Sequence, residues 1–450
     1  MKKFIESLSN VWKIEELKNR ILVTLGLLLV YRFGAQVTLP GIDATKLHGL
    51  TDQTKEGIGW LIDVFTGGAF SQASVFALGI MPYISASIVV QLMGIAVPYL
   101  QKLQKDGESG RKKMNQITRW LTIVITLVQA PGYIFNLYRT LPGEAFLSNV
   151  NPGLISPFAF QFLSVVILVS GTIFAMWLGE KITDKGIGNG ISLLIMVGII
   201  ARMPQAFIQE FSTRVTNNNG GPMLLVFEVI IWLLVIVACV LLVMAVRKIP
   251  VQYARRTVSG EFEQAGNRQW IPLKLNASGV MPIIFAQAIM FIPAALAGLS
   301  SSETATSVST AFQNIFGWQY NLVFALLIIV FTYFYTAITV PTNKMADDLK
   351  RSGGFIPGIK PGAETSEFLD KIMSYITFPG SLFLALIAVF PAIVVTILNV
   401  QPSWALFYGG TSLLIMVGVA SDTIQQINSY LLNKHYDGLM KSGKNRKAVA

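Results

Sequence analysis

The sequence contains few charged residues for its length. Only 13% of its 450 residues are Asp, Glu, Lys or Arg, and 53% are hydrophobic. Because soluble domains carry about 25% charged residues, this composition excludes an ordinary soluble protein. Charged residues are absent altogether from residues 64–101, 145–179, 275–302, 304–343 and 372–421. A membrane-spanning helix needs about 20 apolar residues, so the longest of these stretches can each hold two passes.

Cysteine and histidine are also scarce. The one cysteine, Cys239, lies deep in an apolar run, so neither a disulfide framework nor a thiolate metal site can form. His48 and His435 lie near opposite ends of the chain, which argues against metal binding and histidine-based catalysis. We therefore expect no metal and no cofactor. The N-terminal residues lack a compact apolar core followed by a cleavage site, so we expect no removable signal peptide.

The apolar segments predict ten membrane-spanning helices. A further apolar segment, residues 59–72, is too short for a pass and contains Gly67-Gly68, so it predicts a re-entrant piece. The ten predicted spans cover residues 21–38, 77–98, 116–138, 157–179, 187–208, 223–246, 279–299, 319–341, 374–398 and 404–432.

The basic residues predict the orientation of these spans. Nearly all of the 35 Lys and Arg residues lie in the N-terminal arm, in the C-terminal tail, or in or beside the loops after spans two, four, six and eight. Basic loops stay on the cytoplasmic side, so both termini are expected there. The six exceptions are Arg32, Lys46, Lys55, Arg139, Arg202 and Arg214.

Two loops on the predicted cytoplasmic side are long, namely Lys248–Lys274 and Asn343–Lys371. Long loops are more often functional than merely connective. The net charge of +11 therefore has two interpretations. It is either the signature of membrane orientation alone, or it marks a face that docks a large partner, such as ribosomal RNA contacted through its phosphates.

A six-residue pattern, G-[IV]-M-P-x-I, occurs twice. It opens the second predicted span at Gly79–Ile84 and the seventh at Gly279–Ile284. These spans are the second helices of two five-helix halves, and an odd number of spans gives the halves opposite topology. The pattern therefore predicts an inverted repeat, with the functional path between the halves. Chance matching in an apolar chain, and ordinary proline-containing helix starts, are the alternatives.

Ionisable residues within the predicted spans are few. Arg119 and Arg202 are expected within a turn or two of a helix end, and the carboxylates near the membrane interface. No carboxylate pair, Ser/His/Asp set, H-E-x-x-H or P-loop pattern is present, so we expect no enzyme. The residues within predicted spans are Arg32, Arg119, Arg202, Glu228 and Asp422.

Single polar residues recur in three of the spans, as Gln91, Gln129 and Gln287. Each either bonds to a neighbouring helix or belongs to a polar seam where two helices part. Gly186-Ile187-Gly188-Asn189-Gly190 resembles a phosphate loop only superficially, because no G-K-[ST] follows it. It predicts a tight cytoplasmic turn between the fourth and fifth spans.

Several motifs are similar, almost residue for residue, to those of the bacterial SecY-type protein translocation channels. They occur in order from about residue 20 to 440 and so cover nearly the whole chain. They are Leu39–Asp43, Gly67–Ala69, Ala77–Ile88, Gly107–Arg111, Trp177–Glu180, Gly186–Ile191, Pro250–Tyr253, Pro272–Lys274, Phe355–Gly362 and Gly409–Ile415.

This resemblance implies an all-α polytopic membrane protein with ten transmembrane helices in two inverted halves. It places the N-terminal half at 1–215, with a re-entrant plug helix at about 59–70, the C-terminal half at 216–433 and a basic tail at 434–450. It implies a pore that passes unfolded secretory polypeptides and releases apolar segments sideways into the bilayer. The energy comes from whatever docks on the basic loops.

The resemblance also assigns residue roles. It places a pore constriction at Ile80, Ile84, Ile195, Ile284 and Ile415. It places plug contacts at Leu61, Ile62, Val64 and Phe65, and a lateral gate at spans two and seven, with Gln91, Gln129 and Gln287 as candidates. It places cytosolic docking at Arg255, Arg256, Lys350, Arg351 and Lys360. Lys360 stands where the family usually has Arg, which keeps the charge but loses the planar fork.

The implied partners are the small membrane subunits SecE and SecG, the motor ATPase SecA, the ribosome with its nascent chain, signal sequences and membrane lipid. The implied location is the bacterial plasma (inner) membrane, and a plastid thylakoid membrane is the alternative. A secondary transporter with inverted repeats would instead require an ion-coordinating site at mid-membrane, and an intramembrane protease would require paired catalytic residues. The sequence presents neither.

Overall fold

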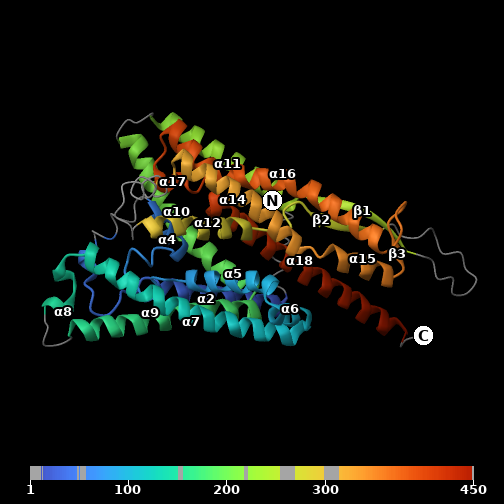
Figure 1. The fold of residues 1–450 in the computed structure, drawn as a ribbon, viewed down its shortest axis with the longest axis horizontal. Helices are drawn as coiled ribbons and strands as arrows, with labels where there is room; N and C mark the ends of the chain where they lie inside the picture. The colour runs from blue at the N-terminus through green and yellow to red at the C-terminus, as the bar shows by residue number, and fades with distance from the viewer. Residues whose placement is uncertain are drawn as a thin grey trace, which may run out of the picture. The chain divides into compact units, whose positions relative to one another are not determined.

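The chain folds into two compact units (Figure 1). The computed structural model describes residues 12, 14–47, 50, 57–150, 156–216, 221–253, 269–297 and 314–447. Unit 1 comprises Met1–Glu210 and Val419–Ala450, and unit 2 comprises Phe211–Gly418. The division at residue 215 and the separate tail from residue 434 stay predictions.

Each of the ten predicted spans coincides with a helix in the described part of the chain. Among the described residues, seven helical segments are long and apolar enough to cross a bilayer, and the number reaches eight if α5 (Met81–Ala96) and α6 (Pro98–Lys105), bent by 101°, form one span. The predicted multi-pass helical fold is therefore confirmed. The ten helices are α2 (Glu15–Gly34), α5 (Met81–Ala96), α7 (Gly107–Thr140), α9 (Pro157–Lys185), α10 (Gly190–Thr216), α11 (Gly221–Met244), α12 (Met281–Ala297), α14 (Trp318–Thr339), α16 (Ala363–Leu398) and α18 (Gly410–Lys447).

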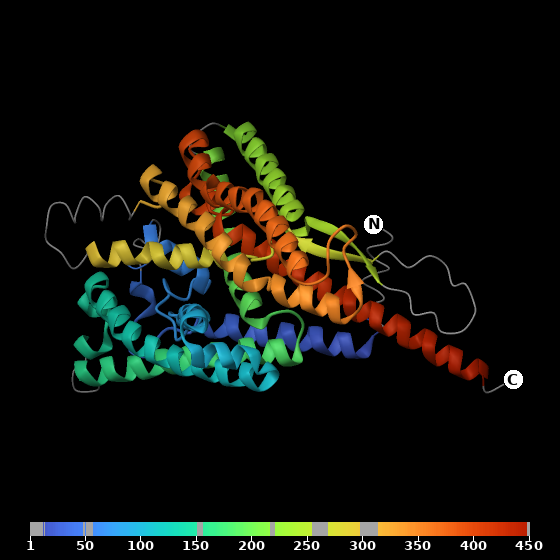
Figure 2. The same ribbon diagram turned by 45° about the vertical axis from the view of Figure 1, so that its right-hand side comes forward.

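In unit 1, α7 packs between α5 and α9, and α2 packs against α9; Figures 1 and 2 show these helices side by side. The buried face of α7 carries Thr118, Thr122 and Thr126, spaced by four residues. Each hydroxyl donates to the carbonyl four residues earlier, at 3.0, 2.7 and 2.7 Å. The polar groups of this stripe are thus satisfied within the helix, which lets it pack against apolar neighbours.

Two loops of unit 1, at residues 35–47 and 141–147, contact each other through backbone hydrogen bonds. The 3-10 helix η1 (Ala44–Lys46) is capped by Asp43, whose carboxylate accepts hydrogen bonds from the Thr45 backbone N–H at 3.0 Å and its hydroxyl at 2.7 Å. These bonds hold the pKa of Asp43 below its ordinary value. An isolated bridge joins Ile42 to Phe146, and Phe146 belongs to the buried cluster between the loops and α7 and α9.

Unit 2 contains a small sheet that the sequence analysis did not identify. Strand β1 (Val246–Tyr253) lies between β2 (Gln269–Lys274) and β3 (Gly354–Phe355), and both pairings are antiparallel. The sheet therefore joins the two long loops predicted on the cytoplasmic side, because β1 and β2 come from the first and β3 from the second. Figures 1 and 2 show it beside α15 (Thr342–Arg351) and the start of α16.

An apolar cluster holds this sheet to the two helices. It consists of Ile249, Val251, Leu273, Leu349, Ile356, Leu369 and Met373. Two hydrogen bonds tie α15 to α16, from Thr342 to Asp370 and from Ser366 to Asn343, both at 2.6 Å. The sheet and both helices thus form one packed module.

The glycine-rich segment 186–190 forms the predicted tight turn, since α9 ends at Lys185 and α10 begins at Gly190. Gly188 adopts a left-handed backbone with φ +80°. A side chain at Gly190 would collide with the carbonyl oxygen of Gly179 on α9. Glycine is required here because two helix backbones approach closely.

Candidate functional site

A short helix, α4 (Gly57–Thr66), lies where the sequence predicts a re-entrant piece. Its ten residues are about 15 Å long, which is half of the hydrocarbon thickness. Val64 and Phe65 are buried, Ile62 is half-buried, and the side chain of Leu61 lies outside the described residues. The helix therefore packs inside unit 1 as a plug-like element, and we call α4 with the turn that follows it, to Ser71, the plug segment.

Two glycines allow the plug segment to approach α10. Gly67 and Gly68 both have left-handed backbones, with φ +66° and +92°. A Cβ on Gly67 would lie 2.7 Å from the Cα of Gly198 on α10, and one on Gly68 would lie 2.9 Å from Nε of Arg202. Any larger residue at either position would be strained and would also collide with α10.

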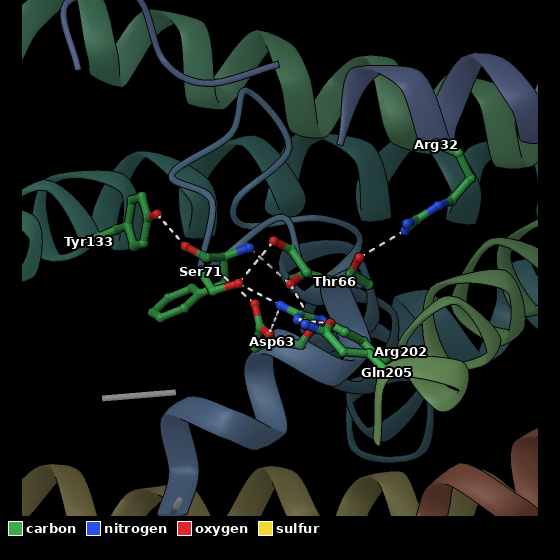
Figure 3. A network of polar contacts seen from close by, with 10 residues as sticks. Arg32, Asp63, Thr66, Ser71, Tyr133, Arg202 and Gln205 are labelled. Atoms are coloured by element: carbon green, nitrogen blue, oxygen red, sulfur yellow. Dashed lines mark hydrogen bonds and ion pairs between the residues drawn. The ribbon is translucent and has the colours of Figure 1, made fainter. Parts of the chain in front are cut away.

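An ion pair with a buried carboxylate and a partly buried guanidinium joins the plug segment to α10 (Figure 3). Asp63 of α4 pairs with the guanidinium of Arg202, which also donates to the hydroxyl of Ser71. The other carboxylate oxygen of Asp63 accepts from the backbone N–H of Ser71 at 2.8 Å. Arg202 also donates a hydrogen bond to the side-chain oxygen of Gln205, at 3.2 Å. A charge buried as deeply as Asp63, at 4% exposure, requires such a partner.

Other helices hold the backbone of the same segment. Arg32 on α2 donates to the carbonyl of Gly67 at 2.8 Å, and the Tyr133 hydroxyl on α7 donates to the carbonyl of Phe70 at 2.9 Å (Figure 3). Within the segment, Thr66 donates to the carbonyl of Asp63 at 3.2 Å. Three helices of unit 1 therefore grip one short element, mainly through polar groups.

Four of the five charged residues in the predicted spans, namely Arg32, Arg119, Arg202 and Glu228, have polar partners. Helix α10 continues to Thr216 and α7 begins at Gly107, so Arg202 and Arg119 each lie about three turns or more from a helix end, and the expectation that they sit near one is wrong. Arg119 forms two hydrogen bonds with Glu180, the one from Nε at 2.9 Å. Asp422 is exposed on α18.

Glu228 lies near the start of α11 and is fully buried within the protein, while its position relative to the membrane interface stays a prediction. It pairs with Arg214 at 2.7 Å, and Arg214 is itself only 3% exposed. Arg214 further donates to the carbonyls of Leu398 and Asn399 at the end of α16, at 2.9 and 3.0 Å. The pair thus ties α10, α11 and α16 together within unit 2.

The repeated pattern has the same local structure in both places. Gly79 and Gly279 are left-handed, with φ +53° and +62°. In each case the following helix begins at the methionine, so that Pro82 and Pro282 occupy the second helical position. Proline is tolerated there because its missing N–H would have no partner within the helix.

The fourth helix of each half, α9 or α16, also closely approaches the turn that precedes the repeated helix start. A Cβ at Gly171 on α9 would collide with the carbonyl oxygen of Val75, four residues before Gly79. A Cβ at Gly380 on α16 would lie 3.0 Å from the carbonyl oxygen of Leu275, four residues before Gly279. This correspondence, which the sequence pattern did not reveal, favours a true repeat over a chance match.

The predicted constriction residues are divided between the units. In unit 1, Ile80 caps α5 and is buried, Ile84 is half-buried in the next turn, and Ile195 is buried on α10. In unit 2, Ile284 is half-buried on α12 and Ile415 is buried on α18. Ile84 and Ile284 thus occupy equivalent positions in matching helices, while their convergence in one ring stays a prediction.

The three predicted gate glutamines have different surroundings. Gln91 is half-buried and donates to Ser87 of its own helix at 3.2 Å. Gln287 on α12 is buried at 6% exposure, whereas Gln129 on α7 is exposed. Gln129 therefore faces outward from unit 1, and a common polar seam stays a prediction.

Three of the five predicted docking residues lie on or beside the module formed by the sheet, α15 and α16, which we call the sheet module. Lys350 and Arg351 are exposed at the end of α15, and Lys360 is exposed and pairs with Glu364 at 3.5 Å. Arg255 and Arg256 lie outside the described residues, between β1 and β2.

Asp63 was missed by the sequence analysis. It immediately precedes the charge-free stretch that begins at Val64, in a segment not counted as a span. Three charges in apolar segments, Asp63, Arg32 and Arg202, could together have indicated that the plug segment is held by polar contacts.

Comparisons with known proteins agree on one family. The sequence model of the SecY family matches residues 74–424. Proteins named protein translocase subunit SecY from Aquifex aeolicus, Thermotoga maritima and Haemophilus influenzae are 38%, 39% and 41% identical to the chain. These alignments cover 97%, 98% and 95% of the chain and 99%, 99% and 94% of the relatives.

Solved structures share the fold. One described as the structure of a protein conducting channel has a TM-score of 0.57 at 17% identity. Another, described by the role of the SecY plug domain in stabilising the closed channel and maintaining a membrane seal, has a TM-score of 0.59 at 16% identity. Each alignment covers 92% of both chains. Motif, fold and near-complete alignment agree, and the chain belongs to the SecY family.

Proposed function

We propose that this chain forms the pore of a protein translocation channel, through which unfolded secretory polypeptides cross the membrane. The observation that carries the proposal is the plug segment, a ten-residue helix gripped by α2, α7 and α10 in a multi-pass protein of the SecY family. A short element held by breakable polar contacts suits a seal that must leave when a polypeptide enters. As a channel subunit, the chain is not an enzyme.

The constriction consists of Ile80, Ile84, Ile195, Ile284 and Ile415. Branched alkyl side chains can neither hydrate nor coordinate an ion, so a narrow ring of them dewets and blocks small ions. The same ring offers an extended polypeptide no strong binding site, so that the polypeptide can slide through it.

The lateral gate lies between α5 and α12, whose matched starts mark them as equivalent helices. A gap there releases apolar segments of about 20 residues into the bilayer, while polar segments continue across. Cysteines placed on the facing sides of the two helices, in a Cys239→Ser background, should cross-link and stop transport until they are reduced. Full transport with the helices joined would place the exit elsewhere.

The sheet module and the segment between β1 and β2 dock the energy source. Lys350, Arg351 and Lys360 give the module a basic surface that suits ribosomal RNA or a motor ATPase. We assign SecA or the ribosome to this surface, and SecE and SecG to the membrane part of the complex. The basic loops place this side and both termini in the cytoplasm of a bacterium, with the spans in its inner membrane.

Transport by the purified protein is the test. The chain, reconstituted in vesicles with its small subunits and the motor ATPase, should move an unfolded secretory precursor to a protease-protected compartment when ATP is present. The same precursor, held folded by a tight ligand, should remain accessible to protease. Uptake of small solutes or ions without precursor transport would instead identify a secondary transporter.

A further inference from the structure

The plug segment carries a single buried charge among its described side chains, and that charge is fully engaged. Both carboxylate oxygens of Asp63 are bound, one by Arg202 and the other by the backbone N–H of Ser71 at 2.8 Å. The backbone carbonyl of Asp63 also accepts from the N–H of Gly68, at 2.8 Å. Asp63 therefore links the helical part of the plug segment, the turn that follows it and α10.

The guanidinium of Arg202 is less completely satisfied. Its two terminal nitrogens bind Asp63, Ser71 and Gln205, but its buried Nε–H has no hydrogen-bond partner among the described residues. If the carboxylate were lost, a guanidinium that is only one quarter exposed would retain only neutral partners. Breaking a buried pair from one side is costly for this reason, because the remaining charge stays in a low-dielectric site.

The other contacts of the plug segment are of a different kind. Val64 and Phe65 bury apolar side chains, and Arg32 donates to a neutral backbone carbonyl, that of Gly67, at 2.8 Å. Charge attraction falls slowly with distance, whereas van der Waals contacts lose about a quarter to a half of their attraction when they separate by about an ångström. The ion pair is thus the contact that continues to oppose departure of the plug segment after the apolar contacts have weakened.

We propose that Asp63 and Arg202 are positioning residues for the closed state, and that their attraction sets how readily the plug segment leaves its seat. This inference rests on the proposed function, because it treats α4 as a seal that moves. Arg202 is the partner on α10, a helix of unit 1 whose first residue, Gly190, closely approaches Gly179 of α9. Asp63 is the mobile partner, carried by the plug segment itself.

The test measures plug departure separately from transport. Val64, at 2% exposure, is replaced by cysteine in a Cys239→Ser background, so that a membrane-impermeant maleimide labels it when the plug segment leaves. Asp63→Asn and Arg202→Gln should each raise the labelling rate, and the ion conductance of the resting channel, by at least about tenfold. The double variant Asp63→Asn with Arg202→Gln should be no worse than either single variant, because one shared interaction is lost.

Two further variants distinguish loss of the ion pair from a general weakening of the contacts that hold the plug segment. Exchanging the charges, as Asp63→Arg with Arg202→Asp, should return the labelling rate toward that of the parent protein. Arg32→Gln is the matched control, since it removes a guanidinium bond to the same segment without removing an ion pair, and it should change the rate less than about threefold. Transport of a signal-bearing precursor verifies that each variant is folded.

The outcomes are distinguishable. If the parent protein passes no precursor, the proposed function fails. If the parent protein passes it but Asp63→Asn keeps the parental labelling rate and conductance, the assignment of the pair is overturned. Equal effects of Arg32→Gln and Asp63→Asn, or independent effects of the two single variants in the double variant, would overturn it as well.

Discussion

Replacing Gly171 by alanine tests whether the fourth helix of each half, α9 or α16, positions the start of the second, α5 or α12. The added methyl carbon would overlap the carbonyl oxygen of Val75 and lie 3.2 Å from the ring of Phe76. The matching change, Gly380→Ala, places the carbon 3.0 Å from the carbonyl oxygen of Leu275. The two substitutions are chemically identical and occupy equivalent positions, yet the available space differs.

The expected magnitudes follow from two opposing terms. Alanine in place of glycine inside a helix contributes up to about 1 kcal/mol of stability. Overpacking costs about 1–3 kcal/mol, and more when a backbone atom must move. At Gly171 the cost of the overlap exceeds the gain in helix propensity, so we expect a net loss of about 1–2 kcal/mol of stability and a displaced turn before α5. At Gly380 a shift of a few tenths of an ångström relieves the contact, so we expect a net change within about 1 kcal/mol of zero.

The single cysteine provides the assay. Cys239 is fully buried in α11, so a thiol-reactive fluorogenic dye reports unfolding during heating in detergent. Gly171→Ala should lower the midpoint by at least about 1–2 °C, at a fixed heating rate, and slow precursor transport. Gly26→Ala is the control, because no atom lies within 4 Å of its added carbon, and its midpoint should not fall. An unfolding midpoint for Gly171→Ala at or above that of the parent protein would refute the inference that α9 positions the start of α5.

Three other predictions address the pore, the fold and docking. Ile84→Ser with Ile284→Ser should let ions leak through the resting channel, because a polar waist stays wet; unchanged conductance in planar bilayers would exclude them from the constriction. Glu228→Leu should destabilise unit 2 by about 3–5 kcal/mol, whereas replacing the acid and its arginine partner together should cost much less; thermal unfolding of both variants decides this. Arg255→Glu with Arg256→Glu should weaken binding of ribosome or motor, most clearly at low salt, and normal translocation would contradict the docking assignment.

The number and order of the helices could be predicted from the sequence because the bilayer imposes a simple rule. A span needs about 20 apolar residues, and each half of the chain supplies five such runs. Helix ends were less predictable, since α10 and α16 extend beyond their apolar cores into polar sequence. Helix propensity and tertiary contacts, rather than hydropathy, determine those ends, which is why Arg202 lies in the middle of its helix.

The polar contacts of the plug segment could not be predicted from local sequence. Asp63 and Arg202 are 139 residues apart, and no periodicity relates them. The small sheet of unit 2 was missed for a similar reason, because β3 has only two residues and depends on its pairing with β1. Composition reveals that charges in apolar segments need partners, but only the folded chain identifies those partners.

Helix α16 gives unit 2 a mechanical property. Near its start, Leu369 packs into the cluster beneath the sheet, and eleven residues later Gly380 touches the turn that begins α12. The separation is about 16 Å of continuous helix, with Pro379 immediately before the second contact. Because Pro379 has no N–H to donate to the carbonyl of Tyr375, α16 can flex between these two contacts. A single helix with a flexible point therefore links the sheet to the turn that precedes α12.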